Sequence, residues 1–468
     1  RISDHERLLD ALSKKDIKRI AHLLQRAKKE NVGIREVLTR VLDAAEDLYA
    51  ARGFTDEDFE LARLLRHIGG HKALWLAGKV FGLPSPSTTS ARSKVPVVTP
   101  SPKQPTRQEL TANVRKMFPT PVDGLARKRR GHSLIVDDIA IRTDMVYCRK
   151  TGCILNVCRE HVGDLDLHVT SYEAVRKVAE HIKSDPPQAH RGSRATVGVI
   201  TAYDKSNYGP TTLFISSSCG AEKAPDFAKI LENAMEAWLE SDRDSTHGPL
   251  WTFCCDGAST FRGACYMKLM CVTFGQCDLE LGQTLARLKG FNQQCGPRGI
   301  VHCPDPKHLF KRAATHARSA EGSLIDGLIV NRGLLTMALA ELPGQSLSNV
   351  DFLLDPADHQ NVPRTIKLLK ALIQVRTLEQ ARMEPAKQLT HRSVCLLSEL
   401  WDLLLQTFLN REFSLSEQLE YLSAFAHLLF ALYRLNRGSK FMCGQLYSDS
   451  HAMSRSPFVC VKRQQLLD

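Results

Sequence analysis

The chain contains LIVDDIAIR at Leu134–Arg142 and LWTFCCDGAST at Leu250–Thr260. In each string a run of apolar residues ends on a carboxylate, at Asp137 or Asp138 in the first and at Asp256 in the second. Burying a lone carboxylate costs several kcal/mol unless a cation or hydrogen-bond donors meet it. We therefore expect two strands that each bring an aspartate to a polar site.

Between these strings the pattern alternates strands with helices. Strands are expected at residues 133–141, 145–148, 154–158, 195–202, 212–216 and 250–254. An amphipathic helix is expected at 224–239, directly before the last strand. A right-handed crossover of this kind makes the last strand parallel to an earlier one. If that earlier strand is the first, Asp137 and Asp256 lie side by side.

Two carboxylates on neighbouring strands suit Mg²⁺, which prefers oxygen ligands and binds one or two carboxylates together with substrate phosphate. Two such ions about 4 Å apart can activate a water or a 3′-hydroxyl and stabilise the leaving oxygen. Asp137 and Asp256 are therefore our candidate catalytic residues and metal ligands. Asp138 points to the opposite face of the strand. The alternative is that these are ordinary strand ends and an Asp-Gly turn, which need no metal.

The chain has 468 residues and carries 63 Lys and Arg against 51 Asp and Glu, a net charge of +12. A basic balance of this size favours a polyanionic partner, with DNA first; a solvated basic surface is the alternative. RKRR at residues 127–130 is typical of a nuclear localisation signal, a phosphate contact or an exposed loop. We expect a nuclear protein, with the cytoplasm as the alternative location.

The 14 cysteines form no CxxC pair, which argues against a zinc knuckle or ribbon. Cys158 and His161 lack further ligands at zinc spacing, and Cys254 and Cys255 are expected to be core thiols. The longest apolar run, near residues 424–435, is interrupted by a histidine and is too short to span a bilayer. We therefore expect no membrane partner.

The composition divides the chain into five segments. They are a helical region at 1–83, a Pro/Ser/Thr-rich linker at 84–106, the first part of an α/β domain at 107–278, an all-α segment at 279–435 and a return toward the α/β domain at 436–468. In the first segment, a helix is expected to begin at Thr55 and to stop at Gly69 and Gly70. Its short helices are compatible with a helix-turn-helix or with a dimerising bundle, and so with a homo-oligomer.

Four strings in this order resemble the P-element transposase family and its THAP-domain relatives. They are LIVDDIAIR, CDGAS at 255–259, HCPDPKHLFKR at 302–312 and DHQNVPRTIKLLK at 358–370. The family has a strand ending in Asp-Glu-Met-x-Ile-Arg, an Asp-Gly strand end, Asp-Pro-Pro-His-Leu-Ile-Lys and an Asp-x-x-Asn-Val helix start. The resemblance covers about residues 70–468. It implies an RNase H-like α/β domain interrupted by an all-α insertion that binds GTP.

The resemblance also implies a nucleotide site. Asp305 and Lys311 would lie in the nucleotide pocket, with Asp358 and Asn361 near the guanine. A carboxylate can accept two hydrogen bonds from guanine, and a lysine can neutralise phosphate. The chain has no Walker A string, so such a site would not be a P-loop. The alternative is a salt-bridged lysine at a helix start and ordinary helix caps.

The family completes its metal site, to which Asp137 and Asp256 would correspond, with a glutamate in an Asp-x-x-Glu string after the insertion. Glu417 and Glu420 share that spacing but lie within a helical run before the expected return. We expect the required glutamate to lie beyond Asp468. No THAP zinc module is visible in the sequence either.

The sequence thus predicts a transposase-derived protein with a DNA strand cleavage and transfer core, dependent on Mg²⁺ if the site is complete. The first alternative is a catalytically inactive DNA-binding remnant that keeps the basic charge. The second is a guanine-nucleotide-binding interaction protein.

Overall fold

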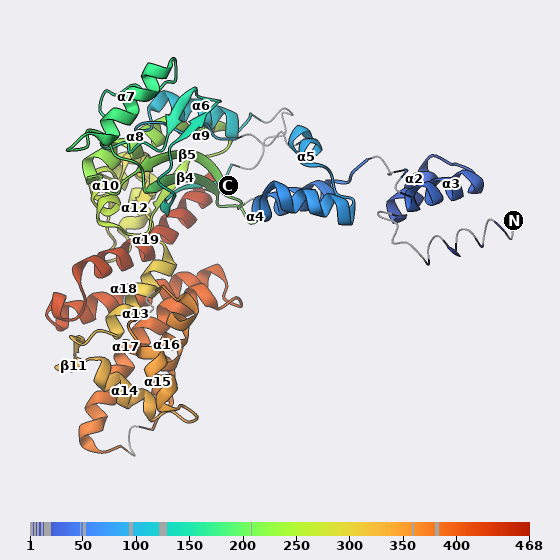
Figure 1. Cartoon of the computed structure of the whole chain (residues 1–468). Coiled ribbons are helices and arrows are strands. Elements are labelled where there is room, and N and C mark those ends of the chain that lie inside the picture. Colours follow the sequence, from blue (N-terminus) through green and yellow to red (C-terminus); the bar gives the residue numbers. More distant parts are fainter. Residues whose placement is uncertain are drawn as a thin grey trace. The chain divides into compact units, whose positions relative to one another are not determined.

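The computed structural model describes most of the chain, which is coloured by sequence in Figure 1. The described residues are 3, 6, 9, 10, 13, 20–46, 48–49, 53–92, 97–120, 129–206, 208–357, 360–379 and 383–468. Contacts divide the chain into two units, Arg1–Pro96 and Val97–Asp468, and we describe each by itself.

The first unit is built from helices. They are α2 (Ile20–Lys29), α3 (Ile34–Ala45), α4 (Asp56–Phe81) and α5 (Pro86–Arg92). The predicted start of α4 is confirmed, because Thr55 and Asp58 each accept the other's backbone N–H in a capping box. The predicted stop is confirmed as a break within α4, where Gly70 has a φ of 72°.

The expected linker at 84–106 contains regular structure. Pro86 begins α5, and the Ser85 hydroxyl accepts a backbone N–H at its start. A serine cap followed by a proline in the first helical position explains why this Pro- and Ser-rich string forms a helix. Farther on, the Ser101 amide donates to the carbonyl of Ile215, so this part of the segment packs along the sheet of the second unit.

The second unit contains a five-stranded sheet in the order β5–β4–β1–β6–β9. Its strands are β1 (His132–Ala140), β4 (Arg194–Ala202), β5 (Thr211–Ser218), β6 (Leu250–Cys254) and β9 (Val301–His302). β4 runs antiparallel to both β5 and β1, whereas β1, β6 and β9 are parallel. The predicted crossover is confirmed, since β6 follows the helix α8 (Ala224–Glu240) and pairs with β1.

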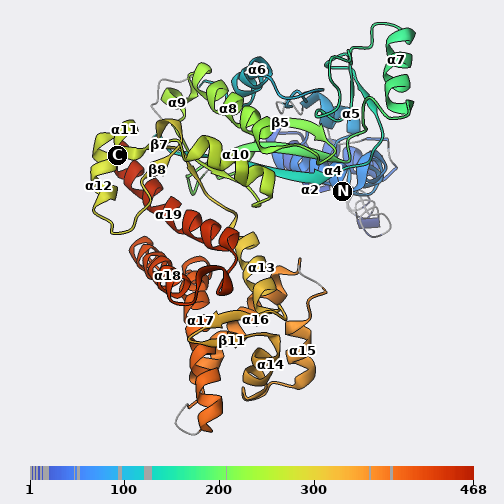
Figure 2. The ribbon, with the colours of Figure 1, turned by 90° about the vertical axis from the view of Figure 1, so that its left-hand side faces the viewer.

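One apolar core joins this sheet to α6 (Arg107–Met117), α8 and α10 (Ser259–Leu269), which Figure 2 shows beside it. Trp238 of α8 is fully buried in this core, and its indole N–H donates to the carbonyl of Gly248 at 3.0 Å. Phe118, which follows α6, packs edge-on against Trp238 with ring centroids 5.0 Å apart. The large aromatic side chain of Trp238 therefore fixes α8 on the sheet.

The connection from β1 to β4 forms a small lobe of its own. It contains β2 (Val146–Cys148) and β3 (Cys153–Leu155), which pair as the predicted hairpin, and the helix α7 (Tyr172–Lys183). Its buried core is small and is built from side chains such as Val157 and Val178.

Most of the remaining chain forms a helical block with a separate core, which includes Trp401 and Phe425. Its elements are α13 (Pro306–Ala317), β10 (Ser323–Ile325), β11 (Leu328–Val330), α14 (Arg332–Ala340), α15 (Leu347–Leu354), α16 (Val362–Gln374), η2 (Val375–Thr377), α17 (Pro385–Leu409), α18 (Leu415–Leu435), η4 (Gly438–Lys440) and α19 (Gly444–Leu467). The chain leaves the sheet through α13 and returns through α19, drawn in red in Figure 2.

The all-α segment expected at 279–435 begins later in the structure. Residues 279–302 lie with the sheet instead, because Leu281 and Val301 share a small core with Val459 of α19. The elements of this part and its neighbours are α9 (Arg243–Thr246), β7 (Val272–Thr273), α11 (Phe274–Cys277), α12 (Leu279–Ala286), β8 (Gln294–Cys295) and η1 (Pro297–Gly299). Within the part of the chain described here, no helix is both long and apolar enough to cross a membrane.

Truncation of the central aromatic tests the assignment of this core. Trp238→Ala should lower the free energy of unfolding of the second unit by about 3–5 kcal/mol, because it removes a fully buried indole and leaves a cavity. Urea denaturation followed by circular dichroism measures the change. Tyr266→Ala on α10 is the control, since Tyr266 is 74% exposed. Equal losses in the two variants would contradict this view of the core.

Candidate functional site

Asp137 and Asp256 come together at one edge of the sheet. The parallel register of β1 and β6 pairs Ile135 with Cys254, and two further residues along each chain bring Asp137 level with Asp256. Partial burial, and after it the negative charge of Asp256, raise the pKa of the Asp137 carboxyl above its ordinary value. The sequence prediction that the two aspartates are neighbours is therefore confirmed.

Asp138 lies on the other face of β1, as the alternation of strand side chains requires. Its carboxylate accepts a hydrogen bond from the Thr196 hydroxyl at 2.6 Å, and Thr196 in turn accepts one from Arg159 at 2.9 Å. Asp138 is thus held in a separate network away from Asp137, although the two are adjacent in sequence.

The turn after β6 holds Asp256 in place. Its carboxylate accepts the backbone N–H of Ala258 at 2.8 Å, just before α10 begins. Gly257 has a φ of 81°, a conformation that side-chain-bearing residues rarely adopt. The Asp-Gly pair therefore forms a tight turn, as in the interpretation that needs no metal, and the Asp256 carboxylate is still close enough to Asp137 to raise the pKa of that carboxyl.

Asp305 follows β9, the next strand along, and belongs to the same edge. Its backbone N–H donates to the carbonyl of Cys255, directly before Asp256, at 3.2 Å. Burial raises the pKa of Asp305, but the bonds from His308 at 2.8 Å and from the Lys307 amide outweigh it and hold the pKa below its ordinary value. Asp305, which the family resemblance places in a nucleotide pocket, therefore caps α13 beside Asp137 and Asp256.

A fourth carboxylate, Asp449 of α19, was missed in the sequence. It is 2% exposed and pairs with Arg262 of α10 at 3.2 Å and with Arg312 of α13. A methyl group placed on Gly257 would lie 3.3 Å from its Oδ2 atom, so Asp449 is beside the Asp256 turn. Since 187 residues separate Arg262 from Asp449, no local sequence pattern could reveal this contact.

The other residues of the expected nucleotide site lie along α13 and α16. Lys311 donates to the side chain of Gln360 at 2.9 Å, which brings α13 next to the start of α16. Asn361 caps α16 by accepting the backbone N–H of Arg364 at 3.0 Å. Asp358 lies outside the described residues. The structure thus brings Lys311 close to the chain before α16 and uses Asn361 as a helix cap.

Glu417 and Glu420 lie on α18 in the helical block. Glu417 forms a capping box with Ser414 at the start of that helix, and Glu420 is exposed. They are on a helix of the block that does not return to the sheet, whereas α19, which begins in the block, continues to the sheet.

The basic string RKRR is only partly described. Arg129 donates to the carbonyl of Asp244 at 2.9 Å and Arg130 reaches Asp468 at 4.0 Å, while residues 127 and 128 lie outside the described part of the chain.

Comparison with known proteins gives a similarity in fold. A solved structure, the Drosophila P element transposase strand transfer complex, is similar with a TM-score of 0.52 and 12% sequence identity. The alignment covers 95% of this chain and 86% of that one. The fold is transposase-like. No protein-family model matches the sequence, and no match is found among curated proteins.

The Asp449 ion pairs give a prediction about stability. Asp449→Asn should lower the free energy of unfolding by about 3–5 kcal/mol, because two arginine side chains are left beside a neutral partner in a buried site. Chemical denaturation measures it. In the control, Glu341→Gln removes a surface pair with Lys387 and should cost about 0–1 kcal/mol. If Asp449→Asn costs no more than the control, the ion pairs do not hold α19 on the sheet.

Proposed function

We propose that this chain is a transposase-derived DNA-binding protein with an RNase H-like core that keeps the acidic pair of a metal site but lacks its third carboxylate. The observation that carries the proposal is the sheet itself. Three strands in antiparallel order are followed by two parallel ones, with Asp137 on β1 and Asp256 just after the end of the neighbouring strand β6. The transposase-like fold supports the same origin.

The acidic pair fits Mg²⁺ in its chemistry. Asp137 and Asp256 offer carboxylate oxygens, and burial together with the charge of Asp256 raises the pKa of Asp137. A divalent cation relieves the repulsion between two such carboxylates. When bound, Mg²⁺ supplies an activated water or 3′-hydroxyl for attack on a DNA phosphate. The protein's own contribution is to fix the two carboxylates on paired strands.

The third position differs from the family pattern. α19 is the helix that returns to the sheet, and it carries Asp449-Ser-His-Ala452 in the spacing of the Asp-x-x-Glu string. On this spacing Ala452 stands where that string has its glutamate, and its side chain has no oxygen to offer. Asp449 itself is engaged by Arg262 and Arg312. This observation favours the catalytically silent form over the active enzyme.

DNA binding rests on the net charge of +12 and on the transposase-like fold. GTP binding along α13 and α16 remains a separate hypothesis, supported by the contact of Lys311 with Gln360. A clear preference for GTP over ATP in a titration would be needed to sustain it. We also propose a nuclear location, on the basic string at 127–130, and self-association through the short helices of the N-terminal segment.

DNA binding should depend strongly on salt. Because affinity for duplex DNA comes largely from counterion release, it should fall about ten-fold or more between about 50 and 200 mM salt. Fluorescence anisotropy with a labelled duplex measures this decline. Absence of binding even at the lower salt concentration would overturn the proposed function.

Restoring the third carboxylate tests the assignment of the site. The wild-type chain should not cleave DNA in Mg²⁺. Ala452→Glu should gain cleavage, because the new carboxylate would lie on the helix that returns to the edge of the sheet carrying Asp137 and Asp256, called the acidic edge below. Cleavage of a labelled duplex with and without Mg²⁺ measures the gain. It should disappear when Asp137→Asn or Asp256→Asn is added.

Asp138→Asn in the same background is the matched control. Asp138 adjoins Asp137 but bonds to Thr196 on the other face, so the gained activity should persist. Mg²⁺-dependent cleavage by the wild type, lost on Asp137→Asn, would sink the silent assignment and support an active enzyme. Equal cleavage in all variants would point to a contaminating nuclease.

A further inference from the structure

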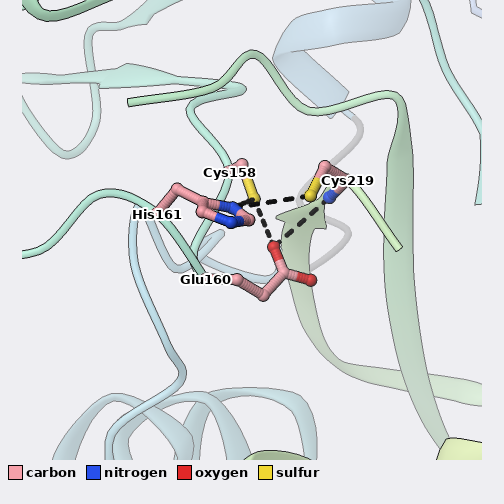
Figure 3. A group of neighbouring side chains, drawn as sticks. All are labelled: Cys158, Glu160, His161 and Cys219. Carbon is pink, nitrogen blue, oxygen red and sulfur yellow. Dashed lines mark hydrogen bonds between the residues drawn. The ribbon is translucent and has the colours of Figure 1, made fainter. Parts of the chain in front are cut away.

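Four side chains with metal-binding groups meet away from the acidic edge. Cys158, Glu160 and His161 lie in the loop that follows β3, within the small lobe between β1 and β4. Cys219 comes directly after β5 of the central sheet. The sequence did not reveal Cys219 as a further ligand beside Cys158 and His161, because it is 58 residues away from His161. Figure 3 shows the four side chains converging on one point.

The spacing of these groups suits a tetrahedral zinc ion. One ligand atom from each residue lies within 4.8 Å of the others. His161 Nδ1 is 3.3 Å from Cys158 Sγ and 3.5 Å from Cys219 Sγ. Zinc bound at about 2.3 Å to sulfur and about 2.0 Å to nitrogen, with tetrahedral angles, separates those atoms by about 3.5 Å. The two sulfurs therefore already lie from the imidazole nitrogen at the distances that an ion would impose.

Hydrogen bonding alone does not account for this convergence. An imidazole nitrogen carries either one proton or one lone pair, so Nδ1 of His161 cannot bond fully to both sulfurs. Glu160 Oε2 also contacts Cys158 Sγ and accepts the backbone N–H of Cys219 at 3.3 Å. A divalent cation would stabilise two thiolates and a carboxylate in the same place.

The loop is held in this shape by contacts outside the cluster. The Cys158 amide donates to the carbonyl of His190 at 2.8 Å, and the Arg159 amide donates to the carbonyl of Ser217 in β5 at 3.1 Å. The buried Arg159 side chain bonds both oxygens of Glu222, at 2.9 and 2.6 Å. These contacts fix the residues on both sides of Arg159, so the ligands need not be ordered by the ion itself.

A second group of side chains that could hold a metal ion consists of Cys255, Cys265 and His302. It has three members, all of them buried in the core. A structural zinc site has four protein ligands, and the first group supplies four, of which Cys158 is buried and Glu160, His161 and Cys219 are partly exposed, so an ion can enter from their side.

We infer that Cys158, Glu160, His161 and Cys219 bind one structural zinc ion. Two thiolates, an imidazole and a carboxylate form a ligand set that zinc accepts, and four protein ligands leave no open position for a reacting water. The ion would join the lobe between β1 and β4 to the end of β5. Because the lobe has only a small apolar core of its own, such a cross-link would stabilise its fold.

Metal analysis of the full chain tests this inference. Protein produced with zinc supplied and then dialysed should contain about one zinc per chain, and Cys219→Ser should reduce this to about one fifth or less. Cys395→Ser is the matched control, because Cys395 also contacts a histidine, His391, at 3.5 Å but belongs to no such group among the described residues. Its zinc content should equal that of the wild type.

Two further measurements keep the inference open to refutation if Cys219→Ser folds poorly. Cobalt in place of zinc should give thiolate-to-metal charge-transfer bands and the intense visible bands of tetrahedral coordination, and Glu160→Gln should alter the visible bands. A strong chelator should lower the melting temperature of the wild type. Wild-type protein without bound metal, or zinc that is lost in Cys255→Ser but kept in Cys219→Ser, would overturn the assignment.

Discussion

The parallel pairing of β1 with β6 is the constraint on which the site depends. It brings Asp137 on β1 close to Asp256, which follows the end of β6, and the two strands cannot separate without breaking the sheet. Two like charges held this close oppose folding, and neighbouring groups offset part of the repulsion. The charge of His308 lowers the pKa of Asp137, and the backbone N–H of Ala258, after the turn at Gly257, donates to Asp256. The acidic edge is thus an unfavourable arrangement that β-sheet hydrogen bonding and the buried core around Trp238 maintain.

The sequence revealed those features that are encoded locally. A run of apolar residues ending in aspartate is sufficient to recognise β1 and β6. The helix before β6 predicts that it is parallel to an earlier strand, but only the structure shows that this strand is β1. By contrast, β9 has two residues, too few to give any alternating pattern, so the position of Asp305 on the acidic edge could not be foreseen. Asp449 and Cys219 were missed for another reason, because their partners are distant in sequence and meet them only in the folded chain.

The two faces of β1 carry different chemistry. On one face Asp137 looks toward Asp256, while on the other Asp138 joins Thr196, Arg159 and Glu222 in a buried polar network. That network adjoins the loop of Cys158 and His161, so the same strand supports the acidic edge and the cysteine–histidine cluster. A single strand whose alternate residues serve separate sites explains why two consecutive aspartates differ so much in their surroundings.

The ion pairs of Asp449 bear on how much the helical block can vary in length. It joins α10, α13 and α19 at one point, so the helical block leaves and re-enters the sheet at almost the same place. A loop whose ends are fixed together costs entropy that rises only with the logarithm of its length, about 0.6 kcal/mol for each doubling. Residues added or removed inside the block would therefore leave the geometry of Asp137 and Asp256 almost unaffected, and the two halves of the second unit could change size independently.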